Sequence, residues 1–561
     1  MILRTAAAGA LATAAALAAT APAPARSAVP APQRTVYTVL AEPHAQRAAV
    51  VRDVTAAGGH VTAVNSAIGT YTATATRRDF VLAVTAKRAV AGATRVRIIG
   101  DAPQPRTPAR HATLFATSFA TENTGPSPVP TLDPLDGKLW NLRMVKADKA
   151  RRYQPGRRGV TVGILDTGID ASNPDLAAHF SAALSRNFAR DIPDVDGPCE
   201  VPSCLDPIGT DDAGHGSHVA GIVGAAADGN GISGVAPNVT LVSLKGGQDS
   251  GLFFLDSVTN ALTYAGDAGI DVVTLSFYLD PWLFHCTANK ADSPQARIEQ
   301  RTSITAMTRA VTYARAHGVT LVAATGNDHT DLGKPLPDDS SPDYPFGDVY
   351  HRTIDNASCF QLPVELPGVI GVSGLGPSGQ KAEYSNYGVE RTDLSAPGGW
   401  LDDGYGTASF GEATNMVLSA RPKAVLQAEG LVDENGVVTD AGAAIGVYKR
   451  CKGSRCGYYG YQEGTSMAVP HVAGVAALVV SQFGIADPRH AGGLTLAPDK
   501  VEKVLYATAT HHACPTPRLR SYQREGLPAE YDAYCAGSPS FNGFYGHGIV
   551  NAEAAIHAPH P

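Results

Sequence analysis

The chain has 561 residues, of which 44% are hydrophobic and 17% charged, a balance typical of globular proteins rather than disordered ones. This length is sufficient for several domains. The formal net charge is −7, which gives no indication of a nucleic-acid partner, because such proteins usually carry basic surfaces.

The N-terminus has the order of a secretory signal peptide. Met1–Arg4 carries one positive side chain, Thr5–Thr20 is uncharged and rich in alanine, and small residues alternate with proline in Ala21–Ala25. A membrane anchor is the alternative, but the apolar stretch is shorter than the ~20 residues that a spanning helix needs. The best remaining apolar segment, Val472–Val480, is shorter still and predicts part of a buried helix. We therefore assign residues 1–30 to a signal peptide and expect a secreted, extracellular protein without membrane contact after signal removal.

Eight cysteines fit an oxidising compartment. Two pairs are close in sequence and two are distant: Cys199/Cys204, Cys451/Cys456, Cys286/Cys359 and Cys514/Cys535. Eight cysteines allow 105 connectivities, so this pairing is a hypothesis. The close pairs could instead bind zinc, but no other ligand cluster accompanies them. We favour structural disulfides.

Residues 34–100 predict a small module of ferredoxin-like β-α-β-β-α-β order. The expected elements are a strand at 35–40, a helix at 45–57, two strands within 60–76, a helix at 79–91 and a strand at 94–99. Residues 34–110 carry a net charge of +7, whereas residues 111–561 carry −16. Such complementarity would bring the two parts together; the alternative is a coincidental distribution of solvated charges.

The segment 101–136 predicts an exposed linker. It contains seven prolines and little apolar periodicity. Segments of this kind are preferred sites of proteolytic nicking.

From about Leu139 onward, apolar strand patterns alternate with helix patterns. Strands are expected at 160–165, 240–244, 272–277, 320–324 and 369–373, and helices at 215–224, 255–268, 301–316 and 467–482. Continuous apolar strands between helices indicate a parallel sheet that is covered on both faces. In such sheets the functional groups gather at the carboxyl ends of the strands.

Ser466 lies between a glycine turn and an apolar, alanine-rich helix pattern within Gly464–Gly474. A hydroxyl at a helix N-terminus is close to free backbone N–H groups and to the positive end of the helix dipole, which favour developing negative charge. Serine alone is a poor nucleophile and needs a base and an orienting acid. Because a serine before a helix is most often only an N-cap, the interpretation depends on those partners.

Asp166 and His215 are the candidate partners of Ser466. Asp166 follows the apolar run 160–165, and His215 opens a helix of small residues. Alone, Asp166 could be a turn residue and His215 a structural histidine. His215 and His218 could also hold a metal on one helix face, because they are three residues apart. The order Asp, His, Ser on one α/β sheet is, however, the chain order of subtilisin-type triads.

These segments resemble motifs of the subtilisin-like serine peptidases (subtilases). Val162–Ile169 resembles the aspartate motif, His215–Gly221 the histidine motif, and Gly464–Gly474 the serine motif. Ala324–Asn327 resembles the segment that carries the oxyanion asparagine. The resemblance covers about 139–556, and its three triad motifs together are highly specific. Four further segments resemble the family less closely: Gly234–Pro237, Tyr384–Gly388, Ser395–Gly398 and Gly546–Ala552.

The resemblance implies a role for each of four residues. Ser466 would attack the scissile carbonyl, His215 would take and return its proton, and Asp166 would hold the imidazole. Asn327 would donate its amide to the oxyanion together with the Ser466 N–H. The alternative for Asn327 is a turn residue that follows Gly326.

The resemblance also implies a fold and a domain order. We expect a doubly wound, mostly parallel subtilisin-like sheet at 137–561, the peptidase catalytic domain with insertions. Residues 34–100 would be the propeptide, a folding chaperone and transient inhibitor. Residues 101–136 would contain the processing site.

Several positions depart from the family pattern. We expect Ser276, Phe277, Tyr278 and Gly326 to contact the substrate, but Tyr278 occupies a position where glycine is common. A phenol ring there would narrow or reshape the specificity pocket. The span 398–464 is far longer than the family usually has, and further extra segments lie at 191–206, 280–301 and 328–367. Several of these segments could flank the cleft and restrict access.

Calcium sites are common in the family, but Ala227–Asn230 only partly resembles the usual calcium loop. We therefore leave the metal unassigned: no cofactor is required for the chemistry, and structural calcium stays an open expectation.

We predict a secreted, self-processing serine endopeptidase that is monomeric and acts on polypeptides. Three alternatives stay open. Tyr278 and the insertions favour a narrow-specificity processing protease. A catalytically silent binding protein would be expected to lack a triad or oxyanion residue. A zinc hydrolase would use His215 and His218.

Overall fold

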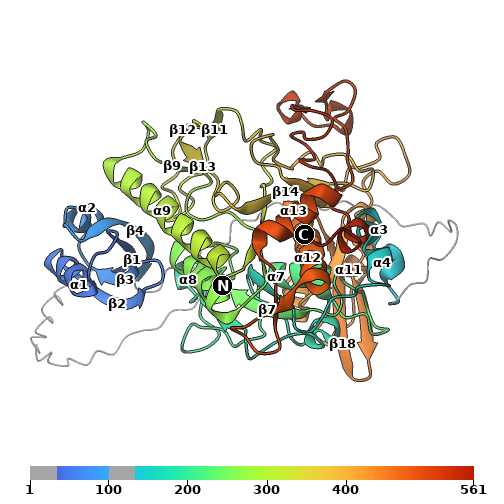
Figure 1. The fold of residues 1–561 in the computed structure, drawn as a ribbon, viewed down its shortest axis with the longest axis horizontal. Coiled ribbons are helices and arrows are strands. Elements are labelled where there is room, and N and C mark those ends of the chain that lie inside the picture. Colours follow the sequence, from blue (N-terminus) through green and yellow to red (C-terminus); the bar gives the residue numbers. More distant parts are fainter. Residues whose placement is uncertain (1–33, 100–132) are drawn as a thin grey trace, which may run out of the picture.

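The computed structural model describes residues 34–99 and 133–561. The expected signal peptide and most of the expected linker lie outside these residues. The described chain forms a small N-terminal module and a large body (Figure 1). The module lies at one end of the molecule, beside two helices of the body.

The module has the predicted element order. It contains β1 (Arg34–Ala41), α1 (Arg47–Ala56), β2 (Gly59–Asn65), β3 (Thr70–Ala75), α2 (Phe80–Thr85) and β4 (Val90–Ile99). The strands form an antiparallel sheet in the order β2-β3-β1-β4.

The second helix of the module is shorter than predicted, and the last strand begins earlier. Gly92 pairs with Leu40 and Val90 with Ala41. The residues from Val90 onward therefore belong to the antiparallel pair of β1 and β4 rather than to a helix. The non-local pairing supplies backbone hydrogen bonds that the local apolar spacing does not reveal.

The body is built on a seven-stranded sheet in which every strand pair is parallel. Its order is β15-β14-β10-β8-β5-β7-β6. The strands are β5 (Thr161–Asp166), β6 (Arg186–Asn187), β7 (Thr240–Lys245), β8 (Val272–Leu275), β10 (Thr320–Ala324), β14 (Val369–Leu375) and β15 (Leu394–Pro397). The predicted strands are therefore present, and β6 and β15 extend the sheet at its edges.

Helices cover both faces of this sheet. On one face α7 (His215–Gly224) and α12 (Thr465–Phe483) pack against strand residues such as Val162 and Ile370. On the other, α8 (Leu255–Ala268) and α9 (Pro294–Ala316) pack against residues such as Leu165 and Leu321. Because alternate strand residues point to opposite faces and both faces are buried, the strands read as continuous apolar runs.

The predicted bounds of α7 and α8 match the structure, but α9 begins seven residues earlier than expected, at Pro294. Ser293 caps it by accepting from Ala296 N–H, and proline occupies the first turn, where it needs no hydrogen-bond donor. The polar composition of this first turn conceals the helix start.

The span 398–464 forms a second, smaller sheet that packs against α7. It contains η2 (Ala413–Asn415), β16 (Val417–Arg421), α10 (Lys423–Ala428), α11 (Asp440–Ala444), β17 (Tyr448–Lys452) and β18 (Arg455–Gln462). Its strands form a sheet in the order β16-β18-β17. A hydrophobic cluster that includes Leu426, Val447 and Tyr458 packs α10 against this sheet.

The remaining elements are short. They are η1 (Asp136–Lys138), α3 (Trp140–Met144), α4 (Ala147–Ala150), α5 (Pro174–Ala177), α6 (Pro193–Asp196), β9 (His285–Cys286), β11 (Leu336–Asp338), β12 (Arg352–Ile354), β13 (Cys359–Phe360), β19 (Ile485–Ala486), β20 (Leu494–Thr495), α13 (Pro498–Thr508), β21 (Leu519–Arg520), η3 (Gln523–Glu525), η4 (Ala529–Tyr531), β22 (Ala533–Tyr534) and α14 (Ala552–Ile556).

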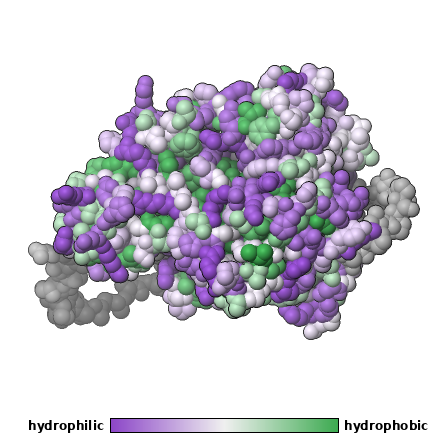
Figure 2. Space-filling view, in the orientation of Figure 1, coloured by the Kyte–Doolittle hydropathy of each residue, from purple (hydrophilic) through white to green (hydrophobic). Residues whose placement is uncertain are grey.

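All four predicted disulfides are present: Cys199–Cys204, Cys286–Cys359, Cys451–Cys456 and Cys514–Cys535. Within the described residues, α12 alone is long and apolar enough to cross a membrane, and 89% of its apolar window is buried inside the protein. It is the buried helix that the sequence predicts at 472–480. The face of the molecule in Figure 2 mixes hydrophilic and hydrophobic residues, with the hydrophobic ones in small patches.

Candidate active site

Two of the four candidate catalytic residues lie at the carboxyl ends of the strands on either side of β8. Leu275 of β8 pairs with Leu165 of β5 on one side and with Ala323 of β10 on the other. Asp166 ends β5, and Asn327 follows the end of β10 by three residues. This is the edge at which parallel sheets place their functional groups.

Asp166 and His215 contact each other directly. His215 Nδ1 lies 2.7 Å from Asp166 Oδ1, and because a carboxylate only accepts, Nδ1 carries the proton and leaves Nε2 free to accept. Burial lowers the pKa of His215, whereas the charge and hydrogen bond of Asp166 and the charge of Asp211 raise it, so the net pKa lies above its ordinary value. The His215 side chain is 30% exposed and that of Asp166 fully buried, an arrangement in which one ring edge faces solvent.

Asp211 holds the loop that precedes His215. Its carboxylate accepts from Thr167 Oγ1 at 2.8 Å, from Gly214 N–H at 2.8 Å, and from the N–H and hydroxyl of Ser217 at 2.8 and 2.6 Å. Gly216 meets the segment after Asp166 so closely that an added Cβ would lie 2.1 Å from a backbone oxygen. These contacts bring the start of α7 against the end of β5.

Ser466 lies in the first turn of α12. Pro470 lacks an N–H, so the carbonyl of Ser466, four residues earlier, has no helical donor. That carbonyl accepts instead from Ser276 Oγ at 3.2 Å, while Ser466 Oγ donates to the carbonyl of Ser276 at 3.0 Å. The nucleophile candidate is thus fixed to the end of β8, next to β5. In the described residues, its hydroxyl has no direct hydrogen bond to His215.

Asn327 is oriented by the residue that precedes Ser466. Asn327 Oδ1 accepts from the N–H of Thr465 at 2.9 Å and from its hydroxyl at 2.8 Å. Since both contacts engage the oxygen, the amide Nδ2 is left to donate, and it has no acceptor among the described residues. Asn386 fixes the following turn by accepting from Asp328 N–H and Thr330 N–H, both at 2.9 Å.

The four predicted substrate-contact residues lie near Ser466 and Asn327, and each makes a different contact. Ser276 contacts Ser466 as described, and Phe277 stacks on Phe253 with ring centroids 4.0 Å apart. Gly326 donates its N–H to Thr465 Oγ1 at 3.3 Å. Tyr278 is 37% exposed, and its hydroxyl donates to Asp343 Oδ2 at 3.3 Å.

A pair of carboxyl groups lies behind Tyr278. Asp280 contacts Asp343, and burial followed by this facing carboxyl raises the pKa of Asp280; burial also raises the pKa of Asp343. Desolvation, followed by the charges of both acids, raises the pKa of Tyr278. The phenol is therefore a neutral hydrogen-bond donor.

The insertion lies close to His215. A Cβ at Gly214 would lie 3.2 Å from Pro422 Cδ and 3.5 Å from Val425. The segment that joins β16 to α10 therefore lies beside His215 and forms one wall next to it.

His215 and His218 do not form a metal site. His218 Nε2 lies 3.1 Å from the Val417 carbonyl and 3.2 Å from that of Gly460, so it donates to β16 and β18. Burial holds the pKa of His218 well below its ordinary value. It is a structural histidine.

The loop that partly resembles a calcium loop has its polar groups occupied. Asn230 donates to Asp175 Oδ1 at 2.9 Å, Tyr459 donates to Asp175 Oδ2 at 2.7 Å, and Asp228 pairs with Lys452 at 2.9 Å. Each of these side chains therefore contacts a protein donor in this structure. The part of the chain that the structure describes contains one acidic group of metal-binding geometry, formed by Asp191, Glu200, Asp206 and Asp249.

The N-terminal module docks on α8 and α9. Asn65 donates to Asn260 and Thr263 of α8 at 2.8 and 2.9 Å. Arg309 of α9 donates to the carbonyls of Ala41 and Ile68 at 3.2 and 3.0 Å.

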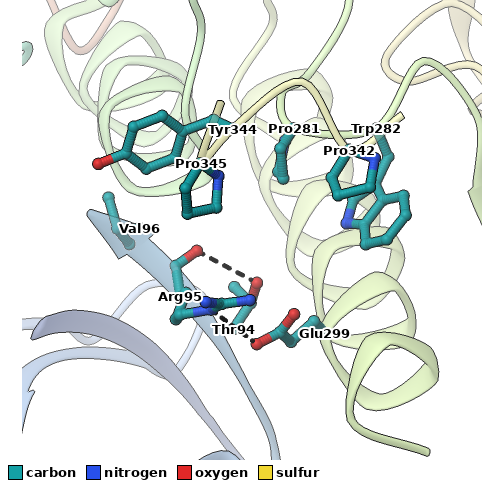
Figure 3. A pocket seen from close by; sticks show the side chains of 9 residues that line it. All are labelled: Thr94, Arg95, Val96, Pro281, Trp282, Glu299, Pro342, Tyr344 and Pro345. Atoms are coloured by element: carbon teal, nitrogen blue, oxygen red, sulfur yellow. Dashed lines mark hydrogen bonds and ion pairs between the residues drawn. The ribbon is translucent and has the colours of Figure 1, made fainter. Parts of the chain in front are cut away.

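β4 of the module lies along α9 at a small pocket. Arg95 approaches Glu299 to 3.5 Å, and Val96 points toward Tyr344 and Pro345 (Figure 3). Gly92 allows this approach, because a Cβ there would lie 2.2 Å from Thr302 Oγ1. The basic module thus contacts the acidic body through at least one ion pair.

The sequence profile of the subtilase family matches residues 157–548. Subtilisin DY of Bacillus licheniformis is 24% identical over 416 residues, which are 74% of this chain and 97% of that protein. Fervidolysin of Fervidobacterium pennivorans is 26% identical over 367 residues, 64% of this chain and 39% of that protein.

Solved structures share the fold. The epidermin leader peptide processing serine protease EpiP from Staphylococcus aureus is 19% identical, with a TM-score of 0.60 over 94% of this chain and 98% of that chain. The fervidolysin structure is 20% identical, with a TM-score of 0.54 over 94% of this chain and 61% of that one.

The chain belongs to the subtilase family and is a subtilisin-like serine protease. Subtilases act on polypeptides and need no cofactor for catalysis.

Sequence reasoning missed the residues that orient the site. Asp211 is not among the predicted site residues, and Thr465 occurs only within the serine motif Gly464–Gly474. The orienting residue Asn386 lies within Tyr384–Gly388, a segment that resembles the family only weakly. That weak resemblance is the signal from which the importance of Asn386 could have been predicted.

Proposed function

We propose that the chain is a secreted serine endopeptidase, made as a self-processed zymogen, in which Asp166, His215 and Ser466 form the triad. The observation that carries this proposal is the 2.7 Å contact between His215 Nδ1 and Asp166 Oδ1 at the sheet edge to which Ser466 is bound. This contact fixes the tautomer that a general base requires.

In the proposed reaction Ser466 first turns its hydroxyl from the Ser276 carbonyl toward His215 Nε2. His215 accepts the proton as Ser466 Oγ attacks the scissile carbonyl carbon. The same proton then passes from Nε2 to the leaving amine, and water repeats the sequence to release the acyl product. Asp166 stabilises the imidazolium throughout.

Asn327 and the N–H of Ser466 would stabilise the oxyanion. The free amide Nδ2 of Asn327 supports this role, since the Thr465 contacts hold the side chain by its oxygen. Donors that are fixed before the reaction need no reorganisation when charge develops.

The module at 34–100 would serve as propeptide and transient inhibitor, with processing within 101–136. Its contacts with α8 and α9 and its positive charge against the acidic body support this role. The secretion signal at 1–30 rests on the sequence, and the monomeric state is part of the proposal.

A narrow-specificity processing protease is the second candidate. It is favoured by Tyr278, whose ring is tied to Asp343, and by the insertion that lies beside His215. EpiP, which has the same fold, is a leader peptide processing serine protease.

A fluorophosphonate probe tests the proposal. We expect one adduct on Ser466 of the mature protein and cleavage of a mixed peptide library. Cleavage of only a few peptides would favour the processing protease. The absence of an adduct would contradict the catalytic role and favour a silent binding protein.

A Ser466→Ala chain tests self-processing. Produced without other proteases, it should stay uncut, with its far-UV dichroism unchanged. Recovery of normally trimmed protein would refute self-processing and leave the adduct experiment unaffected.

A further inference from the structure

The turn that carries Asn327 is held on one side by Asn386. The side-chain oxygen of Asn386 accepts from the N–H groups of Asp328 and Thr330, both at 2.9 Å. His329, the residue between these two donors, has a φ of 48°, in the left-handed region. A residue with a side chain adopts this conformation at a cost in free energy, and it persists where surrounding contacts fix it. The candidate oxyanion donor therefore lies two residues before a strained position that needs support.

The side chain of His329 is supported by Tyr531. The imidazole stacks on the phenol ring, with the ring centroids 4.0 Å apart and an angle of 22° between the ring planes. Burial, followed by the charge of Lys381, lowers the pKa of His329, against a raising by Glu530, so the stacked imidazole is neutral. Neither ring makes a side-chain hydrogen bond within the described residues. The contact between the two rings is therefore one of shape and dispersion.

Tyr531 belongs to a C-terminal segment, residues 509–545, that is itself firmly fixed. It ends the short helix η4, and the disulfide Cys514–Cys535 closes the chain around it. The carboxylate of Asp532, the next residue, accepts from Tyr522 N–H at 3.1 Å. The position of the phenol ring is thus set by the covalent structure and the hydrogen bonds of its own segment.

The C-terminal segment also packs on residues 381–387, which carry the asparagine that supports the turn. Tyr522 is fully buried, and its hydroxyl donates to the Lys381 carbonyl at 2.9 Å. Phe544 meets Tyr387 edge to face, with the ring centroids 5.2 Å apart. The C-terminal segment therefore contacts both the turn and the residues that support it.

We propose that Tyr531 is a positioning residue for the oxyanion donor Asn327. Thr465 holds the oxygen of the Asn327 side chain, but the backbone of the turn decides where the amide lies. The stack on His329 fixes that backbone at its strained residue, so the donor is in place before charge develops. The proposal rests on the proposed role of Asn327 and extends the catalytic apparatus to a segment near the C-terminus.

The test compares the steady-state kinetics of mature protein made from the full-length chain. Tyr531→Ala should lower kcat about 2- to 13-fold, the range that one aromatic pair is worth, with KM unchanged. Affinity for a peptide aldehyde, whose tetrahedral adduct with serine resembles the transition state, should fall by the same factor. Tyr531→Phe keeps the ring and should retain the parent's kcat. Tyr534→Ala is the matched control, because Tyr534 is a 46% exposed tyrosine of the same segment, and it should act as the parent does.

His329→Ala removes the other ring and serves as the test if Tyr531→Ala does not fold. It should lower kcat to a similar extent, and the double variant should lose no more than the larger single loss. The positioning role is overturned if Tyr531→Ala keeps its kcat or changes KM as much as kcat, if Tyr531→Phe is equally slow, if the control loses as much, or if the two losses multiply. A parent that neither labels at Ser466 nor cleaves peptides overturns the proposed function as well, which distinguishes the two failures.

Discussion

The hydroxyl of Ser466 donates to the Ser276 carbonyl over 3.0 Å, and Ser276 donates its own hydroxyl to the Ser466 carbonyl over 3.2 Å. This reciprocal pair exists because Pro470 leaves the Ser466 carbonyl without a helical donor. It binds the first turn of α12 to the end of β8. The nucleophile candidate is thus positioned by a strand as well as by its helix.

Ser276→Ala should therefore lower kcat by about 2- to 13-fold, the equivalent of one neutral hydrogen bond. The Ser466 carbonyl would lose its side-chain donor, and the first turn would be less well fixed. Ser276→Thr keeps the hydroxyl and should retain most of the activity. Steady-state kinetics on one peptide measures both, and equal losses would argue against the hydroxyl contact.

Asn327→Ala should lower kcat about 10²–10³-fold with little change in KM, the range known for such an asparagine in subtilisin, which is itself the reference case. Thr465→Val removes one of the two donors that hold Asn327 Oδ1 but leaves the amide in place. We expect a smaller loss, about tenfold. If Thr465→Val is as damaging as Asn327→Ala, the two residues act as one structural unit and the oxyanion role fails.

The rate should fall in acid as His215 becomes protonated, because only the neutral ring accepts a proton. The charge of Asp211 contributes to the raised pKa of His215. Asp211→Asn should therefore shift the acid limb of kcat/KM to lower pH. Asp212→Asn is the control, since Asp212 is the sequence neighbour but does not bond the His215 loop. An unshifted limb in Asp211→Asn would show that Asp211 only holds the loop.

Tyr278→Gly should broaden specificity, because removal of the ring enlarges the substrate cleft. Poor substrates should gain about tenfold or more in kcat/KM, since a change in pocket size is typically worth 10–200-fold. Tyr278→Phe keeps the ring and loses the bond to Asp343, so it should retain the parent's preferences. A peptide library profile distinguishes the two. Identical profiles for the parent and the glycine variant would exclude Tyr278 as the selective element.

Arg95→Ala should weaken inhibition by the added module about fivefold, which corresponds to a partly exposed ion pair near 1 kcal/mol. Glu299→Gln in the body should have the same effect, and the two changes together should add little more. Arg77→Ala removes the same charge from the module at a site that pairs with Asp79 and should leave inhibition unchanged. Equal weakening by Arg77→Ala would assign the effect to net charge alone.

The sequence predicts the elements whose patterns are local. The helices α7 and α8 and the strand β10 have their predicted bounds, because continuous apolar or small-residue runs define them. The boundary between α2 and β4 differs, because pairing with β1 decides it. The edge strand β15 has four residues, too few for a pattern of its own.

The candidate site also contains residues that a local sequence motif predicts and contacts that only the fold creates. The motifs that contain Asp166, His215 and Ser466 are contiguous in sequence, so a resemblance identifies them. The carboxylates at Asp191 and Asp249 are distant in sequence, and only the fold brings them together. The same holds for the contact of Arg95 with Glu299.

The imidazole of His218 donates to carbonyls on β16 and β18, the two strands from which the long insertion grows. Excising the insertion at its two ends would leave this buried N–H without acceptors, three residues after His215 on α7. The parts of β16 and β18 that contain Val417 and Gly460 are therefore needed by His218. Only the residues between Arg421 and Tyr458 can be exchanged. In a protein built this way, the outer part of the insertion can be exchanged for another segment. The contacts around His215 and His218 would then stay unchanged.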